Sequence, residues 1–275
     1  MKTAQLSRLR LAALTGAALL TLTLAVSPAC AQDGGGGGRT VTVGGGAQTY
    51  PKFPGSDSYG INFMPIIGLR REGTPMPFEG PDDGAGFGLL GRDSVINFGP
   101  AVRFQNKREE DDVGALVGDV GFTVEAGGFV EILPTQNFRL RAELRQGLGG
   151  HKGLTGDISA DLILRDENTY IFSIGPRARW SDNDYNDAYF GVTPAVSGVT
   201  GLAAFNPNSG FYAVGAVAGL TYRLGRNWGV QGYAGYDRLI GDAADSPIVR
   251  SFGSRDQFSG GAGLFIEFNV GGRRR

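Results

Sequence analysis

The chain has 275 residues with 26 basic and 27 acidic side chains, and 47 of its residues are glycine. So many glycines with only 19% charged residues are typical neither of an ordinary helical protein nor of a highly charged disordered chain. The charge balance gives no support to nucleic-acid binding.

The N-terminus has the pattern of a secretory signal peptide. Basic residues precede an apolar run over residues 11–26, and small residues over 27–31 offer a cleavage site. This favours a cleaved signal peptide over residues 1–31 above a single membrane-anchor helix. Cleavage would remove Cys30, the only cysteine, which excludes disulfides and thiol chemistry from the mature chain. It would also remove three of the 26 basic residues, so the mature charge is about −4.

Residues 32–58 are expected to form a flexible leader. Glycine fills positions 34–38, and Val41 and Val43 are too few to predict a dependable strand.

The remainder predicts strands. After residue 31 no apolar run approaches the roughly 18 residues of a spanning helix, and an exported chain without helices can cross a membrane only as a closed barrel. The clearest strand is Asn137–Leu148, in which apolar and charged residues alternate and must face opposite sides of a sheet. Ten strands are predicted in all: 59–70, 84–90, 94–105, 122–133, 137–148, 156–165, 169–181, 210–224, 228–240 and 257–270.

Loop lengths indicate the topology. Short turns at Arg92, Pro134, Asp166 and Gly225 belong on the periplasmic side of a bacterial barrel, and the long loops belong outside. The predicted fold is all-β, a transmembrane antiparallel up-and-down barrel of ten strands over residues 59–270, followed by a basic tail over 271–275. An extra pair of strands within 182–209, otherwise one long outer loop, would make twelve.

The two faces of the predicted strands differ. Arginine and glutamate are absent from the apolar face, as lipid demands, because a charge at mid-bilayer costs about 2–4 kcal/mol. A soluble periplasmic barrel with an apolar interior is the competing interpretation. Aromatic residues near strand ends are expected to form interfacial girdles, namely Tyr59, Tyr170, Trp180, Tyr212, Tyr222, Trp228 and Tyr236.

The polar face is expected to line the lumen. In so narrow a barrel, nearly balanced charges favour an interlocked, salt-bridged interior over a selectivity filter. The predicted lumen-lining residues are Arg103, Glu125, Glu131, Arg139, Arg141, Glu143, Arg145, Asp157, Asp161, Arg177, Arg179, Arg223 and Glu267, with Arg165 and Asp237 beside them.

Catalysis, a cofactor and a metal site are not expected. Barrel hydrolases need a histidine beside a nucleophile or a carboxylate, and the one histidine, His151, lies in a glycine-rich turn where a surface position is predicted. The acids Asp182, Asp184 and Asp187 lack the spacing of a calcium loop.

Several segments together resemble the MipA/OmpV family of outer-membrane proteins. The most specific are Tyr189-Phe-Gly-Val192 and the run over residues 241–249, and the resemblance covers about residues 50–270. It implies an integral outer-membrane barrel of a Gram-negative bacterium, surrounded by outer-membrane lipid. It further implies a scaffold that connects a lytic transglycosylase and a murein synthase to that membrane. A small porin for ions and small solutes is the alternative. One departure from the usual pattern is that the chain continues beyond Phe268 to a basic end, where outer-membrane barrels usually finish on an aromatic residue.

Overall fold

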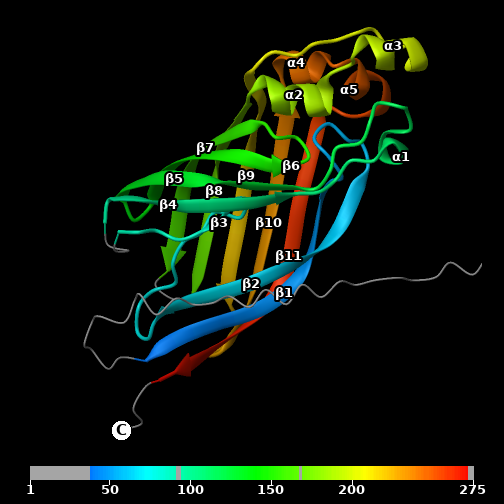
Figure 1. Ribbon diagram of the computed structural model, residues 1–275. Coiled ribbons are helices and arrows are strands. Elements are labelled where there is room, and N and C mark those ends of the chain that lie inside the picture. Colours follow the sequence, from blue (N-terminus) through cyan, green and yellow to red (C-terminus); the bar gives the residue numbers. More distant parts are fainter. Residues whose placement is uncertain (1–37, 91–93, 167–168, 272–275) are drawn as a thin grey trace, which may run out of the picture. The chain divides into compact units, whose positions relative to one another are not determined.

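The computed structural model describes residues 38–90, 94–166 and 169–271, which form one sheet with helices at one end (Figure 1). Neighbouring strands are antiparallel throughout, in the order β2-β1-β11-β10-β9-β8-β7-β6-β5-β4-β3. The predicted signal peptide lies outside the described residues, as does the tail from residue 272. The strands are β1 (Arg39–Pro51), β2 (Tyr59–Arg71), β3 (Ala85–Gly86), β4 (Ile96–Gln105), β5 (Thr123–Thr135), β6 (Phe138–Gly149), β7 (Leu154–Asp166), β8 (Tyr170–Ser181), β9 (Gly210–Arg223), β10 (Trp228–Leu239) and β11 (Asp256–Val270).

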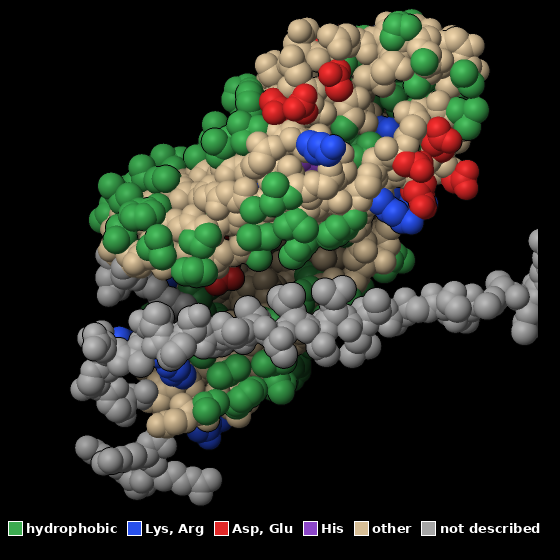
Figure 2. Space-filling view, in the orientation of Figure 1, with side chains coloured by type: hydrophobic (Ala, Val, Ile, Leu, Met, Phe, Trp, Pro, Cys, Tyr) green, Lys and Arg blue, Asp and Glu red, His purple; other side chains and the backbone are tan. Residues whose placement is uncertain are grey.

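The alternation of the sequence is reproduced as two faces of the sheet. In β6 the charged residues are buried, whereas Leu140 and Leu144 are 40% and 52% exposed on the outer face. Apolar side chains cover much of the outer surface of the strands, and acidic ones gather at the end where α1 lies (Figure 2). The all-β antiparallel fold is therefore confirmed. Within the described residues, no helix has the length and apolar character required to cross a membrane.

The flexible leader was the wrong prediction for residues 39–51, which form β1. This strand pairs residue by residue with β11 on one side and with β2 on the other. Its glycines, which suggested a linker, are required by close backbone packing: a Cβ on Gly44 or Gly46 would collide with the Leu264 or Ala262 carbonyl oxygen. The sheet thus has eleven strands, not ten.

Because β1 precedes it, β2 runs in the direction opposite to that predicted for the first strand. Because β2 is antiparallel to β1, it runs toward the end where β1 begins and β11 finishes, called the terminal end below. The connection over residues 72–84, called the inner segment, therefore starts at the terminal end and is not the outer loop that the sequence predicted. β2 and β3 consequently run in the same direction, and they are the two edges of the sheet.

Five short helices lie at the opposite end, called the capped end. The extra pair of strands considered for residues 182–209 is not present, since two helices occupy that stretch. Asp182 begins the first of them by accepting a hydrogen bond from the Tyr185 backbone N–H, 3.0 Å away, as an N-cap residue does. The helices are α1 (Glu110–Val113), α2 (Asn183–Phe190), α3 (Pro194–Thr200), α4 (Gly241–Asp245) and α5 (Pro247–Phe252).

One predicted girdle residue, Tyr212, has a different place. The pairing of β8 with β9 shifts register between Arg179 and Trp180, so Tyr212 leaves the outward row of its strand. Its ring packs against Tyr185 and Phe190 of α2, with ring centroids 5.3 and 6.2 Å apart. The sequence of β9 alternates regularly through Tyr212, so it does not indicate the bulge.

Candidate functional site

Four charged side chains of β6 form the centre of the interior. Arg139, Arg141, Glu143 and Arg145 are between 1% and 8% exposed, because every second residue of a strand faces the same side. Charges removed from water to this degree need partners with good hydrogen-bond geometry. Neighbouring strands and the inner segment supply these partners.

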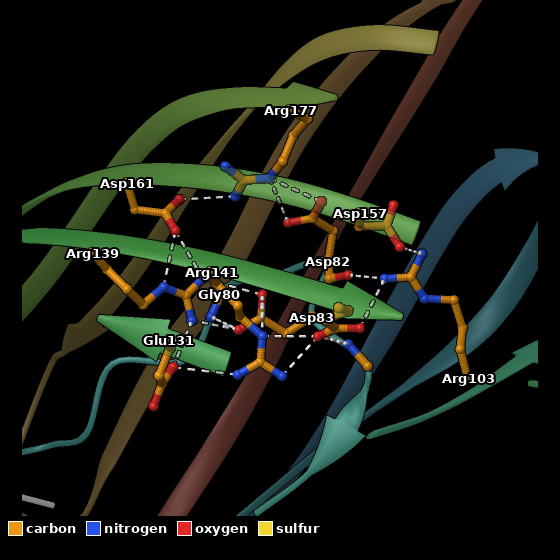
Figure 3. A network of polar contacts seen from close by, with 12 residues as sticks. Gly80, Asp82, Asp83, Arg103, Glu131, Arg139, Arg141, Asp157, Asp161 and Arg177 are labelled. Atoms are coloured by element: carbon orange, nitrogen blue, oxygen red, sulfur yellow. Dashed lines mark hydrogen bonds and ion pairs between the residues drawn. The ribbon is translucent and has the colours of Figure 1, made fainter. Parts of the chain in front are cut away.

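Arg139 is held from two directions. Asp161, the cross-strand neighbour on β7, accepts from its Nη2 at 2.7 Å and from its Nε at 3.1 Å. Asp83 of the inner segment accepts from Nη1 at 2.6 Å and from Nη2 at 3.1 Å. Bidentate contacts of this kind are the strongest geometry available to a guanidinium group. Figure 3 shows Arg139 between these carboxylates.

Arg145 joins three carboxylates nearer the capped end. Its Nε donates to Glu125 at 3.0 Å, and its two Nη atoms contact Glu143 and Asp157. Arg103, from β4, reaches the same Asp157 at 3.3 Å. The network therefore joins residues of strands β4, β5, β6 and β7.

The inner segment lies on the inner side of the curled sheet, against its charged side chains. The Asp82 carboxylate accepts from Arg177 at 2.9 Å, and the Asp82 carbonyl oxygen accepts from Arg103 at 2.7 Å (Figure 3). The same carboxylate accepts from Arg179 at 3.3 Å. Phe78 lies over the Arg139 guanidinium, with the ring centroid 4.7 Å from the central carbon. This segment thus supplies carboxylates that the strands alone do not provide.

Apolar contacts also hold the inner segment in place. Met76 packs against Ile163 and Ile171, which face inward from β7 and β8. Cavities beside the segment are small, about 30 and 10 Å³, which is room for one or two water molecules. Neither of these two cavities, both lined by described residues, has room for a solute of metabolite size.

Further contacts cross the interior to β10. Arg179 on β8 donates to Asp237 on β10 at 3.0 Å and to Asp157 at 2.9 Å. Side chains from β4 to β10 are therefore joined across the lumen.

A second, apolar layer closes the capped end. Four connections between strands contribute buried side chains to one hydrophobic cluster, which has no exposed member. Its members are Phe53, Val113, Val117, Val120, Tyr185, Tyr189, Phe190, Val192, Ala213, Leu239, Ala243, Ala244, Ile248 and Val249. Burial raises the pKa of the Tyr185 hydroxyl well above its ordinary value, so this group stays neutral.

The surface position predicted for His151 is wrong. The side chain is buried between the two layers, with its ring 4.9 Å from that of Tyr185. Its Nε2 lies 3.2 Å from Glu125, and its Nδ1 accepts the Gly153 backbone N–H at 3.1 Å. Both ring nitrogens therefore have structural partners, and within the described residues neither contacts a hydroxyl or a thiol. The tight glycine-rich turn directs the histidine side chain inward. The turn has no strand alternation, so its sequence does not predict this direction.

Comparison with known proteins places the chain in a family. Residues 43–268 match the family described as MltA-interacting protein MipA. The chain belongs to this family. Over 200 residues it is 26% identical to the MltA-interacting proteins of Escherichia coli (strain K12) and Shigella flexneri, covering 70% of this chain and 77% of each relative.

Similarity to solved structures is weaker. The NanC porin matches with a TM-score of 0.39 and 11% identity, covering 82% of this chain and 98% of the porin. OprG of Pseudomonas aeruginosa matches with a TM-score of 0.25 and 8% identity, covering 85% of this chain and 97% of OprG. Family membership therefore rests on the sequence match, which extends from β1 to β11.

The structure divides the predicted lumen-lining residues of this family member into two groups. Arg223 and Glu267 lie apart, near the terminal end, where they pair with each other. The others belong to the central network: Arg103, Glu125, Glu131, Arg139, Arg141, Glu143, Arg145, Asp157, Asp161, Arg177 and Arg179.

Sequence reasoning missed three members of these groups. Asp82 and Asp83 lie in a segment rich in proline and glycine that has no strand periodicity, and Arg70 lies at the end of a strand with loose alternation. The one available signal was that the inward arginines on the predicted strands outnumber the inward acids by one.

Proposed function

We propose that this protein is an integral outer-membrane barrel that acts as a scaffold, connecting murein-remodelling enzymes to the membrane, and that it is not an enzyme. The observation that carries the proposal is the filled interior: an ion-pair network and an apolar cap occupy the inner side of the curled sheet in a member of the MltA-interacting protein family. A filled lumen favours a binding role over the alternative of a small porin. Among the described residues neither ring nitrogen of the buried His151 contacts a hydroxyl or a thiol, which favours a role without catalysis.

The outward face supports the membrane placement. The exposed side chains of β2 include Ile61, Phe63 and Ile67, at 84%, 71% and 68% exposure, an arrangement that is costly in water and suited to lipid. Short connections at the terminal end and longer ones at the capped end favour a periplasmic position for the terminal end. A murein enzyme would then meet the terminal end.

Capture by the immobilised protein tests the scaffold role. The refolded barrel should retain a purified lytic transglycosylase of the MltA type at physiological salt. Arg226, exposed in the turn between β9 and β10 at the terminal end, is predicted to contribute, so Arg226→Glu should weaken retention several-fold.

The matched control is Arg250→Glu in α5, an exposed arginine at the capped end, which should leave retention unchanged. Failure of the unmodified barrel to retain the transglycosylase, or equal loss in both variants, would contradict docking at the terminal end.

A further inference from the structure

Among the described strand residues, three arginines and a single glutamate face inward near the terminal end, apart from the central network. Arg70 is on β2 and Arg223 is on β9, and each of these strands is two places from β11, which carries Glu267. Arg165 faces inward from β7, a further two strands along. These four residues are called the terminal arginine cluster below.

The contacts of Glu267 show how this cluster is held. Arg70 donates through Nη2 to both carboxylate oxygens, at 3.2 and 3.3 Å, and Arg223 contacts Oε2 from the other side. Thr42 on β1 donates to Oε1 at 3.1 Å. One carboxylate is thus shared by two guanidinium groups, and its oxygens have no further capacity for a third.

Donors in this cluster remain without acceptors. The Nε atoms of Arg70, Arg165 and Arg223 are buried and have no hydrogen-bond partner among the described residues, and they are half of the six buried polar side-chain atoms of which this is true. The Arg70 side chain is only 8% exposed. Buried donors without acceptors are costly, particularly on a charged group.

The charge balance differs from that of the central network. In the central network each arginine contacts two or more carboxylates, and two of these carboxylates, Asp82 and Asp83, come from the inner segment. In the terminal arginine cluster Arg70 and Arg223 share one carboxylate and a third arginine lies two strands from Arg223, so these four residues together carry an excess of two positive charges. A shielded excess of positive charge with free guanidinium donors is suited to an oxyanion.

We propose that the terminal arginine cluster is a binding site for an oxyanion, a phosphate or carboxylate group that enters from the terminal end. Arg70 and Arg223 bind the anion from either side of Glu267, and Arg165 adds attraction from β7. This proposal does not rest on the scaffold role, and anion binding can be measured on the isolated barrel without any murein enzyme.

Calorimetric titration of the refolded full-length barrel tests the proposal. Inorganic phosphate is the probe, acetate is a second arm that separates phosphate from carboxylate preference, and ionic strength is held constant with sodium chloride. Arg70→Gln and Arg223→Gln should each weaken binding at least about tenfold, because each removes one partner of a desolvated charge pair. Arg238→Gln, at an exposed pair with Asp256 near the capped end, is the matched control and should bind as the unmodified protein does.

Glu267→Gln distinguishes a ligand site from a purely structural salt bridge. Without the competing carboxylate, phosphate should bind more tightly and should restore the thermal stability lost in phosphate-free buffer. A structural salt bridge would lose stability with no restoration by phosphate. Heat-dependent mobility on gels verifies that each variant is folded.

Two results would overturn the proposal. One is an absence of phosphate and acetate binding by the folded, unmodified barrel. The other is binding that is equal in Arg70→Gln, Arg223→Gln and the Arg238→Gln control, which would indicate general attraction to a basic surface.

Discussion

Asp161 shows most clearly how the interior is stabilised at the scale of single residues. Its side chain is fully buried, and it accepts hydrogen bonds from both Arg139 and Arg177. Asp161→Asn keeps the size of the side chain but leaves two buried guanidinium groups without their shared anion. We expect a loss of about 3–5 kcal/mol in the free energy of unfolding, measured by denaturant unfolding of the barrel in detergent micelles.

The control for this prediction is Asp256→Asn. Asp256 pairs with Arg238 where both side chains are about half exposed, so water and salt screen the interaction. Little change in stability is expected there. Equal effects of the two substitutions would show that the central network does not stabilise the fold.

Individual residues also show how far the sequence predicts the interior. The strict alternation of β6 placed Arg139 and Arg145 on the inner face, because a strand offers only two directions. Their partner Asp83 could not be found in this way, since the inner segment has no period. A long-range ion pair depends on how a loop crosses the barrel, and local sequence does not encode that.

At the scale of elements, β1 shows why a glycine-rich stretch can be a strand. Its backbone pairs on both sides, and its glycines allow β11 to approach closely. Propensity argues against a strand here, but pairing with two neighbours overrides it. The other strands were predictable to within a few residues because their side chains alternate, with the exception of β3, which is far shorter than predicted. The helices of the cap were not predicted, because short helices held by tertiary packing have little periodicity of their own.

The role of β1 can be tested with one glycine. A Cβ on Gly46 would collide with the Ala262 carbonyl oxygen, so Gly46→Val should force β1 and β11 apart and reduce the folded fraction severely. Gly210→Val at the start of β9 is the matched control, because a Cβ there meets nothing within 4 Å. Heat-dependent gel mobility after refolding measures both, and a fully folded Gly46→Val barrel would show that this close approach is not required.

At the scale of the whole molecule, two layers fill the interior of the curled sheet. The ion-pair network, which includes carboxylates of the inner segment, fills the middle of the barrel. The hydrophobic cluster fills the capped end. Charged side chains on the inner face of an outer-membrane strand therefore need not indicate a channel. In this protein they hold the inner segment in place.

Single-channel recording tests this account most directly. The refolded barrel, shown to be folded by its heat-dependent mobility, is inserted into a planar bilayer beside a known porin that verifies the assay. We predict that the barrel gives no stable conductance steps, because the side chains of the central network and the cap fill its interior. Regular, reproducible conductance steps from the folded, unmodified protein would contradict the filled interior and would favour a small porin.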